Sequence, residues 1–243
     1  MIEHAIEVFN KYTNNFDKSV ELIKIRYDHS ISVMNLMGEL AILLKLSDED
    51  IELAKLIGLL HDIGRFDQIK KYNSCSDTKT GMDHALHGCD YLFKENHIRD
   101  FIEYNKYDDI INKAIYHHNK IRIDGNLNDK ELLFSKMIRD MDKLDIYHEE
   151  GKYFTCSFNS DDLTSIVEEE FKSGKLIDMK NLKTPTDGTM LELGLIYDIN
   201  FKESMDMFNK TKYFEEFINS VRVTSNSTDK WNEIKTICLN SLK

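Results

Sequence analysis

Residues that interrupt helices are scarce in this chain of 243 residues. The sequence contains one proline, Pro185, and ten glycines. These two residue types least favour the interior of a helix, so long helices can run with few breaks. Apolar residues recur along most of the chain at the three-to-four-residue spacing of an amphipathic helix. Together, these features predict an all-α fold.

Cysteine is also scarce. The four cysteines, Cys75, Cys89, Cys156 and Cys238, are scattered along the chain and form no Cys-x-x-Cys pair. Their distribution argues against a structural zinc site built from thiolates and against a disulfide framework in a chain of this size. Because the N-terminus also lacks a basic-then-apolar signal pattern, we expect the protein to be cytoplasmic.

Long apolar runs and an excess of positive charge are both missing. No stretch reaches the roughly 18 uninterrupted apolar residues of a membrane span, so we expect no membrane partner. The net charge is −11, from 32 Lys and Arg against 43 Asp and Glu. Proteins that bind DNA or RNA in bulk cluster Lys and Arg against the phosphates, so this balance argues against nucleic acid. It is compatible with a small substrate in a locally positive site and with the binding of cations.

The apolar spacing predicts where helices lie. They are expected near residues 2–9, 20–44, 51–60, 83–94, 109–118, 130–147, 161–171, 190–221 and 229–242. Ser47 followed by Asp50 resembles a capping box at the start of the third stretch. Residues 152–160 are expected to be a short extended piece, and residues 175–188 to be irregular.

The polar segment Phe66–Met82 is predicted to be a surface loop, long enough to carry function. The regular helical pattern of the sequence changes after residue 150. This change predicts a compact helical core over residues 1–150 and a helical extension over 151–243. Large apolar residues at helical spacing in the extension, such as Phe208 and Phe217, indicate core packing or a homodimer surface. The extension is expected to pack on the core, where it can also serve as a lid.

Six of the nine histidines and two aspartates lie at or near the ends of different expected helices. They are His29, His61, His84, His87, His117, His118, Asp62 and Asp142. Side chains that project inward from facing helices build metal sites in helical bundles. Imidazole nitrogens combined with carboxylate oxygens suit Mn, Fe, Co, Ni or Zn. Adjacent His61 and Asp62 diverge by about 100° on a helix, so they can flank one ion while Asp62 bridges to another.

Taken alone, each of these residues has an ordinary structural interpretation. His117 and His118 can cap the C-terminus of a helix, where the helix dipole favours histidine. Asp142 can be one more charge on a solvated face, and Arg65 can pair with Asp67 or with a helix end. The order of the set along the chain, rather than any one member, points to a metal site.

This order resembles the HD-domain superfamily of metal-dependent phosphohydrolases. LLHDIGRF is similar to the HDIG motif, DHALHG to the H-x-x-x-G motif, AIYHHNK to the next histidine motif, and IRDMDKLDIY to the terminal aD-x-L-D motif. The resemblance covers residues 22–148. It implies an all-α HD fold with one or two divalent metal ions, and the extra histidines place the chain with the HDIG and HD-GYP-like two-metal branch. The GYP element has no match, which argues against cyclic-di-GMP as the substrate.

The resemblance also implies two groups of metal ligands that share one carboxylate. The first ion would be held by His29, His61, Asp62 and Asp142. The second would be held by Asp62, His84 and His118. His117 is an alternative to His118 or a ligand to a further ion, and His87 lies beside or outside the site. The ions implied are Mn, Fe, Ni, Co or Zn, with Mg also compatible.

Gly64 and Arg65, which follow His61 and Asp62 in the sequence, also have expected roles. Gly64 is expected to let the chain turn after the ligands. Arg65 replaces the more usual lysine, keeps its positive charge and can grip a phosphate bidentately.

The leading hypothesis for function is hydrolysis of a phosphomonoester or phosphodiester, nucleotide-like in character. A metal-activated hydroxide would attack the phosphoryl group, with Asp62 and Arg65 as the catalytic residues. Two alternatives stand beside it. One is a diiron oxygenase of the same superfamily, and the other is a non-catalytic nucleotide-binding regulator, which the six intact ligand positions disfavour.

Overall fold

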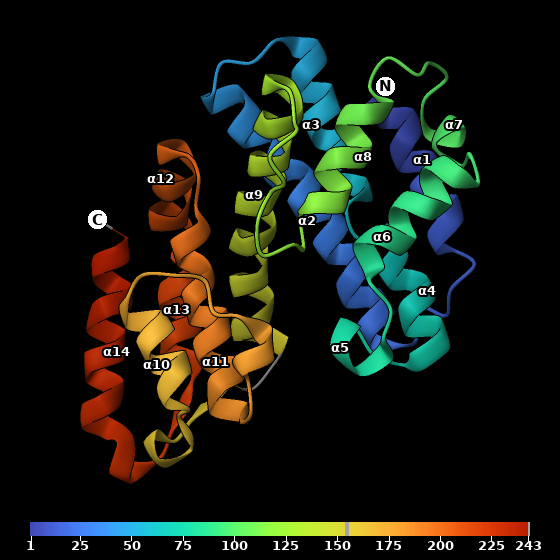
Figure 1. Ribbon diagram of the computed structural model, residues 1–243. Coiled ribbons are helices and arrows are strands. Elements are labelled where there is room, and N and C mark those ends of the chain that lie inside the picture. The colour runs from blue at the N-terminus through green and yellow to red at the C-terminus, as the bar shows by residue number, and fades with distance from the viewer. Residues whose placement is uncertain (154–155, 243) are drawn as a thin grey trace. The chain divides into compact units, whose positions relative to one another are not determined.

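The computed structural model describes residues 1–153 and 156–242 and is helical through most of them (Figure 1). The all-α fold expected from the sequence is confirmed. The chain forms two compact units, Met1–Asp142 and Lys143–Lys243. Their boundary falls inside one helix, α9 (Asp129–Tyr153), and the division into core and extension near residue 150 stays a prediction. No helix in the described ranges is long and apolar enough to cross a bilayer.

The first unit consists of helices joined by loops. In chain order these helices are α1 (Ile2–Thr13), α2 (Glu21–Leu43), α3 (Asp48–Leu60), α4 (Ile63–Tyr72), α5 (Asp77–Thr80), α6 (His84–Cys89), α7 (Ile98–Phe101), α8 (Asp108–His117) and the first part of α9. A π-helical turn, η1 (Asp90–Lys94), continues α6. The predicted cap of α3 is present, because Ser47 Oγ accepts a hydrogen bond from the Asp50 amide at 3.2 Å.

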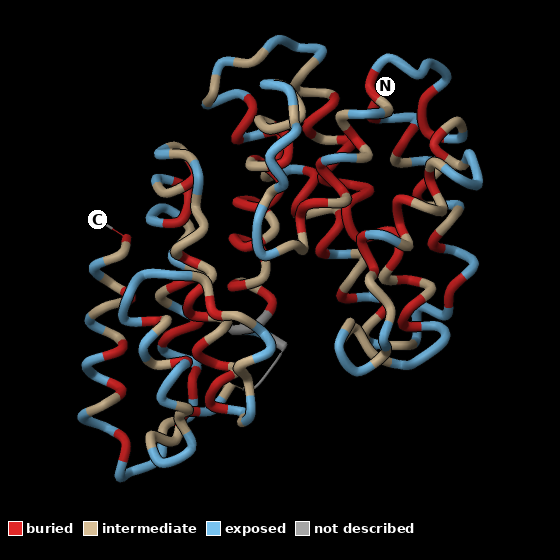
Figure 2. Tube along the Cα trace, in the orientation of Figure 1, coloured by how far each residue is buried: buried red, intermediate tan, exposed pale blue. Residues whose placement is uncertain are grey.

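Helices α2 and α3 pack along each other and supply much of the apolar core of this unit. Val33 and Met37 of α2 and Leu53 of α3 are fully buried, and Figure 2 shows buried positions along both helices. The backbones approach closely at Gly58, where a Cβ atom would lie 2.8 Å from Cα of Met34. Each large apolar side chain buried in such a contact contributes about 1.5–3 kcal/mol, so the contact holds the two helices in a defined register.

The prediction of a surface loop over residues 66–82 is wrong for its first part. Helix α4 continues to Tyr72 and buries Phe66, whose ring packs edge-on against Phe9 with centroids 5.8 Å apart. The outer face of α4 is charged and its apolar positions are few, so periodicity alone does not reveal the helix. Asn73 ends it in the left-handed conformation, with φ 49°. The rest of the segment is a loop that contains the single-turn helix α5.

The second unit is also helical. It contains the second part of α9, followed by α10 (Ser165–Lys172), α11 (Pro185–Gly194), α12 (Lys202–Thr211), α13 (Tyr213–Ser220) and α14 (Thr228–Ser241). The 3-10 turns η2 (Ser160–Asp162), η3 (Met179–Asn181), η4 (Leu195–Asp198) and η5 (Ser225–Ser227) lie between them. Two short strands, β1 (Ser157–Phe158) and β2 (Arg222–Val223), pair in parallel. Strand β1 confirms part of the predicted extended piece, of which residues 154–155 lie outside the described residues.

Two predictions for this unit are wrong. The segment 175–188, expected to be irregular, contains the start of α11 at Pro185, and the stretch 190–221 is divided among α11, η4, α12 and α13. Proline is favoured in the first turn of a helix because its missing N–H is not needed there. Thr184 and Asp187 close a capping box in front of it, since Thr184 Oγ1 accepts from the Asp187 amide at 3.0 Å and the Asp187 carboxylate accepts from the Thr184 amide at 3.1 Å.

Aromatic side chains form the core of the second unit. Phe208, Phe214 and Phe217 are buried, and their ring centroids lie 5.9, 4.6 and 5.5 Å from that of Tyr147. The Tyr147 hydroxyl donates to the carbonyl of Glu192 at 3.0 Å, which satisfies the one polar group of this buried ring. The predicted core packing of these phenylalanines is confirmed.

Candidate metal centre

The six side chains predicted to bind metal converge in the first unit. They are His29 on α2, His61 and Asp62 at the junction of α3 and α4, His84 at the start of α6, His118 directly after α8, and Asp142 on α9. Five of them are buried, and the side chain of Asp142 is 14% exposed. Distant parts of the chain thus deliver imidazole and carboxylate groups to one place, as helical bundles do in metal proteins.

One group of these side chains, called the first half, consists of His29, His61, Asp142 and one oxygen of Asp62. His29 Nε2 lies 3.1 Å from both His61 Nε2 and Asp142 Oδ1. His61 Nε2 lies 3.5 Å from Asp142 Oδ1. Oδ2 of Asp62 lies 3.8 Å from His29 Nε2 and 4.0 Å from His61 Nε2. The four groups therefore face a common point.

The second half consists of His84, His118 and the other oxygen of Asp62. The two Nε2 atoms are 2.9 Å apart. Oδ1 of Asp62 lies 3.1 Å from Nε2 of His84 and 3.5 Å from Nε2 of His118. The two oxygens of Asp62 thus face different halves, which is the placement expected of a bridging carboxylate.

At the junction of α3 and α4, one residue that departs from helical dihedral angles separates the two helices. His61 keeps helical dihedral angles at the end of α3, whereas Asp62 has φ −103° and ψ 17°, in the sparsely populated bridge region between helix and strand. Helix α4 starts at the next residue. The helical path is interrupted at this junction, and two consecutive side chains both reach the centre.

Gly64 has a different role from the turn expected of it. It lies in the first turn of α4, where a Cβ atom would be 2.3 Å from the carbonyl oxygen of His84 and 2.8 Å from the amide nitrogen of Gly88. Such distances are shorter than any real Cβ contact. Gly64 is required because the backbones of α4 and α6 touch there, and this contact places His84 beside Asp62.

Hydrogen bonds at the outer ring nitrogens define how three of the imidazoles face the centre. Nδ1 of His61 donates to the carbonyl of Gly58 at 2.8 Å, and Nδ1 of His118 donates to the carbonyl of Ile115 at 2.6 Å. Nδ1 of His84 donates to the carboxylate of Asp77 at 2.7 Å. Because these partners are acceptors, each Nδ1 carries a proton and each ring turns its Nε2 atom to the centre.

The spacing of the donor atoms in the second half fits a metal ion. Two Nε2 lone pairs and a carboxylate oxygen meet within 2.9–3.5 Å, and such an arrangement is stable only with positive charge between its members, from a proton or a metal ion. Ligand atoms bound to one ion at about 2.0–2.2 Å lie roughly 3.0–3.5 Å apart. The donor types and their spacing therefore fit a divalent transition metal.

The charges of the centre suit the same conclusion. Burial raises the pKa of Asp62, but His61, His118, His84 and Arg65 lower it well below its usual range. Burial lowers the pKa of His118 to about 4. The carboxylate is thus ionised and this imidazole neutral near pH 7, and these are the forms that bind metal.

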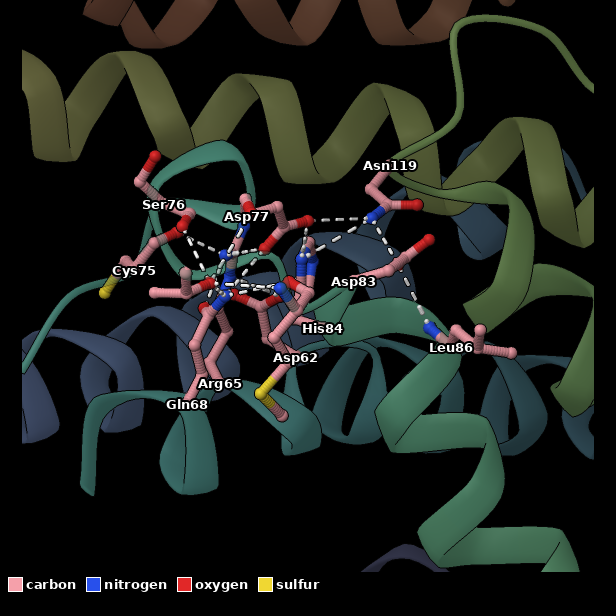
Figure 3. Close-up of polar contacts among 12 residues, drawn as sticks. Asp62, Arg65, Gln68, Cys75, Ser76, Asp77, Asp83, His84, Leu86 and Asn119 are labelled. Atoms are coloured by element: carbon pink, nitrogen blue, oxygen red, sulfur yellow. Dashed lines mark hydrogen bonds and ion pairs between the residues drawn. The ribbon is translucent and has the colours of Figure 1, made fainter. Parts of the chain in front are cut away.

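Arg65, predicted to face the substrate, belongs to a polar network with the loop that follows α4 (Figure 3). Its Nη1 donates to Gln68 Oε1 and to Asp77 Oδ1, each at 2.8 Å, and also to the carbonyl of Cys75. Its Nε lies 3.6 Å from Oδ1 of Asp62. The guanidinium group therefore lies beside the carboxylate of Asp62 and pairs with Asp77. Its catalytic role stays a prediction.

Sequence reasoning missed three residues around the centre: Arg26, Asp77 and Asn119. Arg26 Nη1 lies 3.3 Å from Oδ2 of Asp62, and the side chain is 12% exposed. Its position three residues before His29 puts both on one helix face, which was a usable signal. Asp77 and Asn119 lie in connecting segments, where periodicity carries no information.

Two predicted alternatives lie away from the converging atoms. His87 pairs with Asp67, its Nε2 3.2 Å from Oδ2, and the two side chains are 38% and 41% exposed. His117 is buried and packs its ring against Tyr116 with centroids 5.0 Å apart. Among the described residues, His118 rather than His117 contributes to the groups that can hold a metal.

Fold and site together define a helical protein with clustered histidine and aspartate side chains able to hold divalent metal. Residues 26–147, about half of the chain, match the family model of the HD domain, and the chain belongs to this family. HD domains bind divalent metal ions and are generally phosphohydrolases. Searches of curated proteins and of solved structures found no match.

Proposed function

We propose that the protein is a phosphohydrolase with a binuclear metal centre of the HDIG and HD-GYP-like kind, acting on a phosphomonoester or phosphodiester. The shared carboxylate carries this proposal, because Oδ2 of Asp62 faces His29 and His61 while Oδ1 faces His84 and His118. Two divalent ions held in this way lower the pKa of a bound water and neutralise charge on a phosphoryl group. Membership of the HD domain family supports a hydrolytic reaction.

Two arginines flank the bridging carboxylate and supply charge of the sign that a phosphoryl group requires. Arg26 lies 3.3 Å from Oδ2 of Asp62, and Arg65 lies 3.6 Å from Oδ1. Guanidinium groups near a reacting phosphate stabilise the negative charge of its transition state. Because Arg65 Nη1 already donates to three acceptors, we assign Arg65 an electrostatic contribution from its present position.

The substrate that we propose is a small, nucleotide-like phosphate ester, and not a nucleic acid polymer. The net charge of −11 opposes extended contact with a phosphate backbone. Four imidazoles and two carboxylates favour Mn, Fe, Co, Ni or Zn over Mg, which prefers a set of oxygen ligands. The scattered cysteines, which form no Cys-x-x-Cys pair, accord with the cytoplasmic location that we also propose.

Replacement of Asp62 by alanine tests the proposal directly. Asp62→Ala is expected to lose both ions and all measurable hydrolysis, because the one carboxylate common to both halves is removed. Metal content by mass spectrometry, followed by a panel of nucleotides and phosphoesters with added Mn, Ni, Co or Mg, measures the two losses. Asp67→Ala removes a carboxylate outside the centre and is expected to keep the ions. Wild-type hydrolysis by a metal-free Asp62→Ala protein would contradict the proposal.

The same purified protein separates hydrolysis from oxygenation. A diiron oxygenase would develop a mixed-valent diiron signal after anaerobic iron loading and exposure to oxygen, and would consume oxygen. We expect no such turnover. Oxygen consumption without hydrolysis of any ester in the panel would replace the proposed reaction with oxygenation.

A further inference from the structure

The carboxylate of Asp77 collects four hydrogen bonds from separate parts of the first unit (Figure 3). Its Oδ1 accepts from Arg65 Nη1 at 2.8 Å and from Gln68 Nε2 at 2.9 Å. Its Oδ2 accepts from His84 Nδ1 at 2.7 Å and from Asn119 Nδ2 at 3.2 Å. Residues of α4, α6 and the segment after α8 therefore meet on one side chain at the start of α5.

Gln68 anchors the loop that carries Asp77. Its side chain is fully buried, and Nε2 donates to Asp77 Oδ1, to Thr80 Oγ1 at 2.9 Å and to the Met82 carbonyl at 3.0 Å. Its Oε1 accepts from Arg65. A buried amide with several partners resists movement, because loss of these bonds would leave polar atoms unsatisfied. The loop is thus tied to α4 from the inside.

His84 differs from His61 and His118 in the kind of support it receives. His61 and His118 each donate from Nδ1 to a carbonyl three residues earlier in the same helix. His84 donates to a side chain of another element, Asp77 of α5. The orientation of His84 therefore depends on a tertiary contact that one substitution can remove.

We propose that Asp77 is a positioning residue that orients His84 and thereby determines how tightly the second half of the centre holds its metal ion. This inference rests on the proposed binuclear centre. A carboxylate bonded to the outer nitrogen of a ligating histidine sets its tautomer and ring orientation and makes the inner nitrogen a better electron donor. The first half has no atom in contact with Asp77 among the described contacts and retains its ligands without it.

Metal titration of the Asp77→Asn protein tests this inference without relying on activity. Cobalt(II) is added to metal-depleted protein, and binding is followed by calorimetry and visible absorption. The affinity of the second half is expected to fall about 10- to 100-fold, so one equivalent binds more weakly than in the wild type and the other is unchanged. Asp67→Asn is the matched control, because Asp67 also pairs with a histidine between α4 and α6 but outside the centre. It is expected to bind both equivalents as the wild type does.

Several outcomes would overturn the inference. One is an Asp77→Asn protein that binds both equivalents as tightly as the wild type. Another is an equal loss of affinity at both halves, and a third is a wild-type protein that binds only one equivalent. Should Asp77→Asn fail to fold, Asn119→Ala replaces it, since this variant removes one donor to Asp77 Oδ2. We then expect a smaller loss confined to one equivalent, and unchanged binding would overturn the inference. A wild type that binds two ions and hydrolyses no ester would refute the proposed function alone, because the titration does not depend on turnover.

Discussion

The first half of the candidate metal centre takes its histidines from two longer helices, and the second half takes them from the ends of two shorter ones. In the first half, His29 comes from the interior of the 23-residue helix α2 and His61 from the end of α3, and apolar side chains pack these helices together. In the second half, His84 and His118 come from the ends of α6 and α8, and the polar contact with Asp77 orients His84. Apolar packing holds α2 and α3 through many side chains, whereas the polar network that orients His84 depends on a few hydrogen bonds. The halves should therefore respond separately to substitution.

Removal of one ligand from either half should produce the largest difference in metal affinity between the two halves. We expect Asp142→Ala to weaken the first half and His84→Ala to weaken the second, each by more than about 100-fold, because loss of a ligand exceeds the loss of its supporting partner. Cobalt titration should leave one equivalent in each variant, with a different absorption spectrum in the two cases. Loss of both equivalents in both variants would show that the halves bind as one unit.

The close approach of α4 and α6 offers a second way to separate the halves. Gly64→Ala places a Cβ atom against the backbone of His84, so the helices must move apart. We expect a loss of about 3 kcal/mol in the free energy of unfolding and weaker binding at the second half, measured by denaturant unfolding and metal titration. Gly125→Ala is the control, because a Cβ atom there meets nothing within 4 Å. Equal stability of the two variants would contradict the close contact.

The buried carboxylate of Asp187, outside the centre, tests whether weaker metal binding merely reflects a general loss of stability. Asp187 is buried and accepts from the Thr164 amide at 2.9 Å, the Thr164 hydroxyl at 2.6 Å and the Lys183 amide at 2.9 Å. Asp187→Ala should lower the free energy of unfolding by about 1–2 kcal/mol and leave both metal affinities unchanged. Asp206→Ala, at a side chain that is 62% exposed, should change stability by less than about 0.5 kcal/mol.

The effect of Asp187 should also depend on pH. Burial raises the pKa of Asp187, but its hydrogen bonds to Thr164, Lys183 and Thr184 bring it below the usual value. Its stabilisation is then complete above the unfolded pKa of about 3.9 and is lost as the pH falls through the lower folded pKa. Unfolding measured at pH 7 and near pH 3 should show a smaller difference between wild type and Asp187→Ala at the lower pH. A difference that grows in acid would contradict this assignment.

The convergence of the six side chains could be predicted because it depends on motif order and helix ends. His61 and Asp62 follow an apolar helix directly, and His84, His118 and Asp142 follow at the boundaries or on the faces of later helices. These local features are visible in the sequence. The all-α fold follows in the same way from the scarcity of proline and the regular apolar spacing.

The remaining features depend on tertiary neighbours that local patterns do not contain. Helix α4 has too few apolar positions to be recognised, and its burial depends on rings such as Phe9. Gly64 looks like a turn residue, but its purpose is defined by the backbone of His84, twenty residues away. Asp77 resembles any aspartate in a polar loop until His84 and Asn119 are brought to it.

The carboxylate of Asp62 carries one negative charge and has an oxygen turned to each half. A cation at one oxygen draws on the charge available at the other and repels a second cation nearby. We therefore expect negative cooperativity, in which each ion weakens the binding of the other by the same factor, as linkage requires. The protein should load in two resolved steps, and a singly loaded form should persist over a range of metal concentrations.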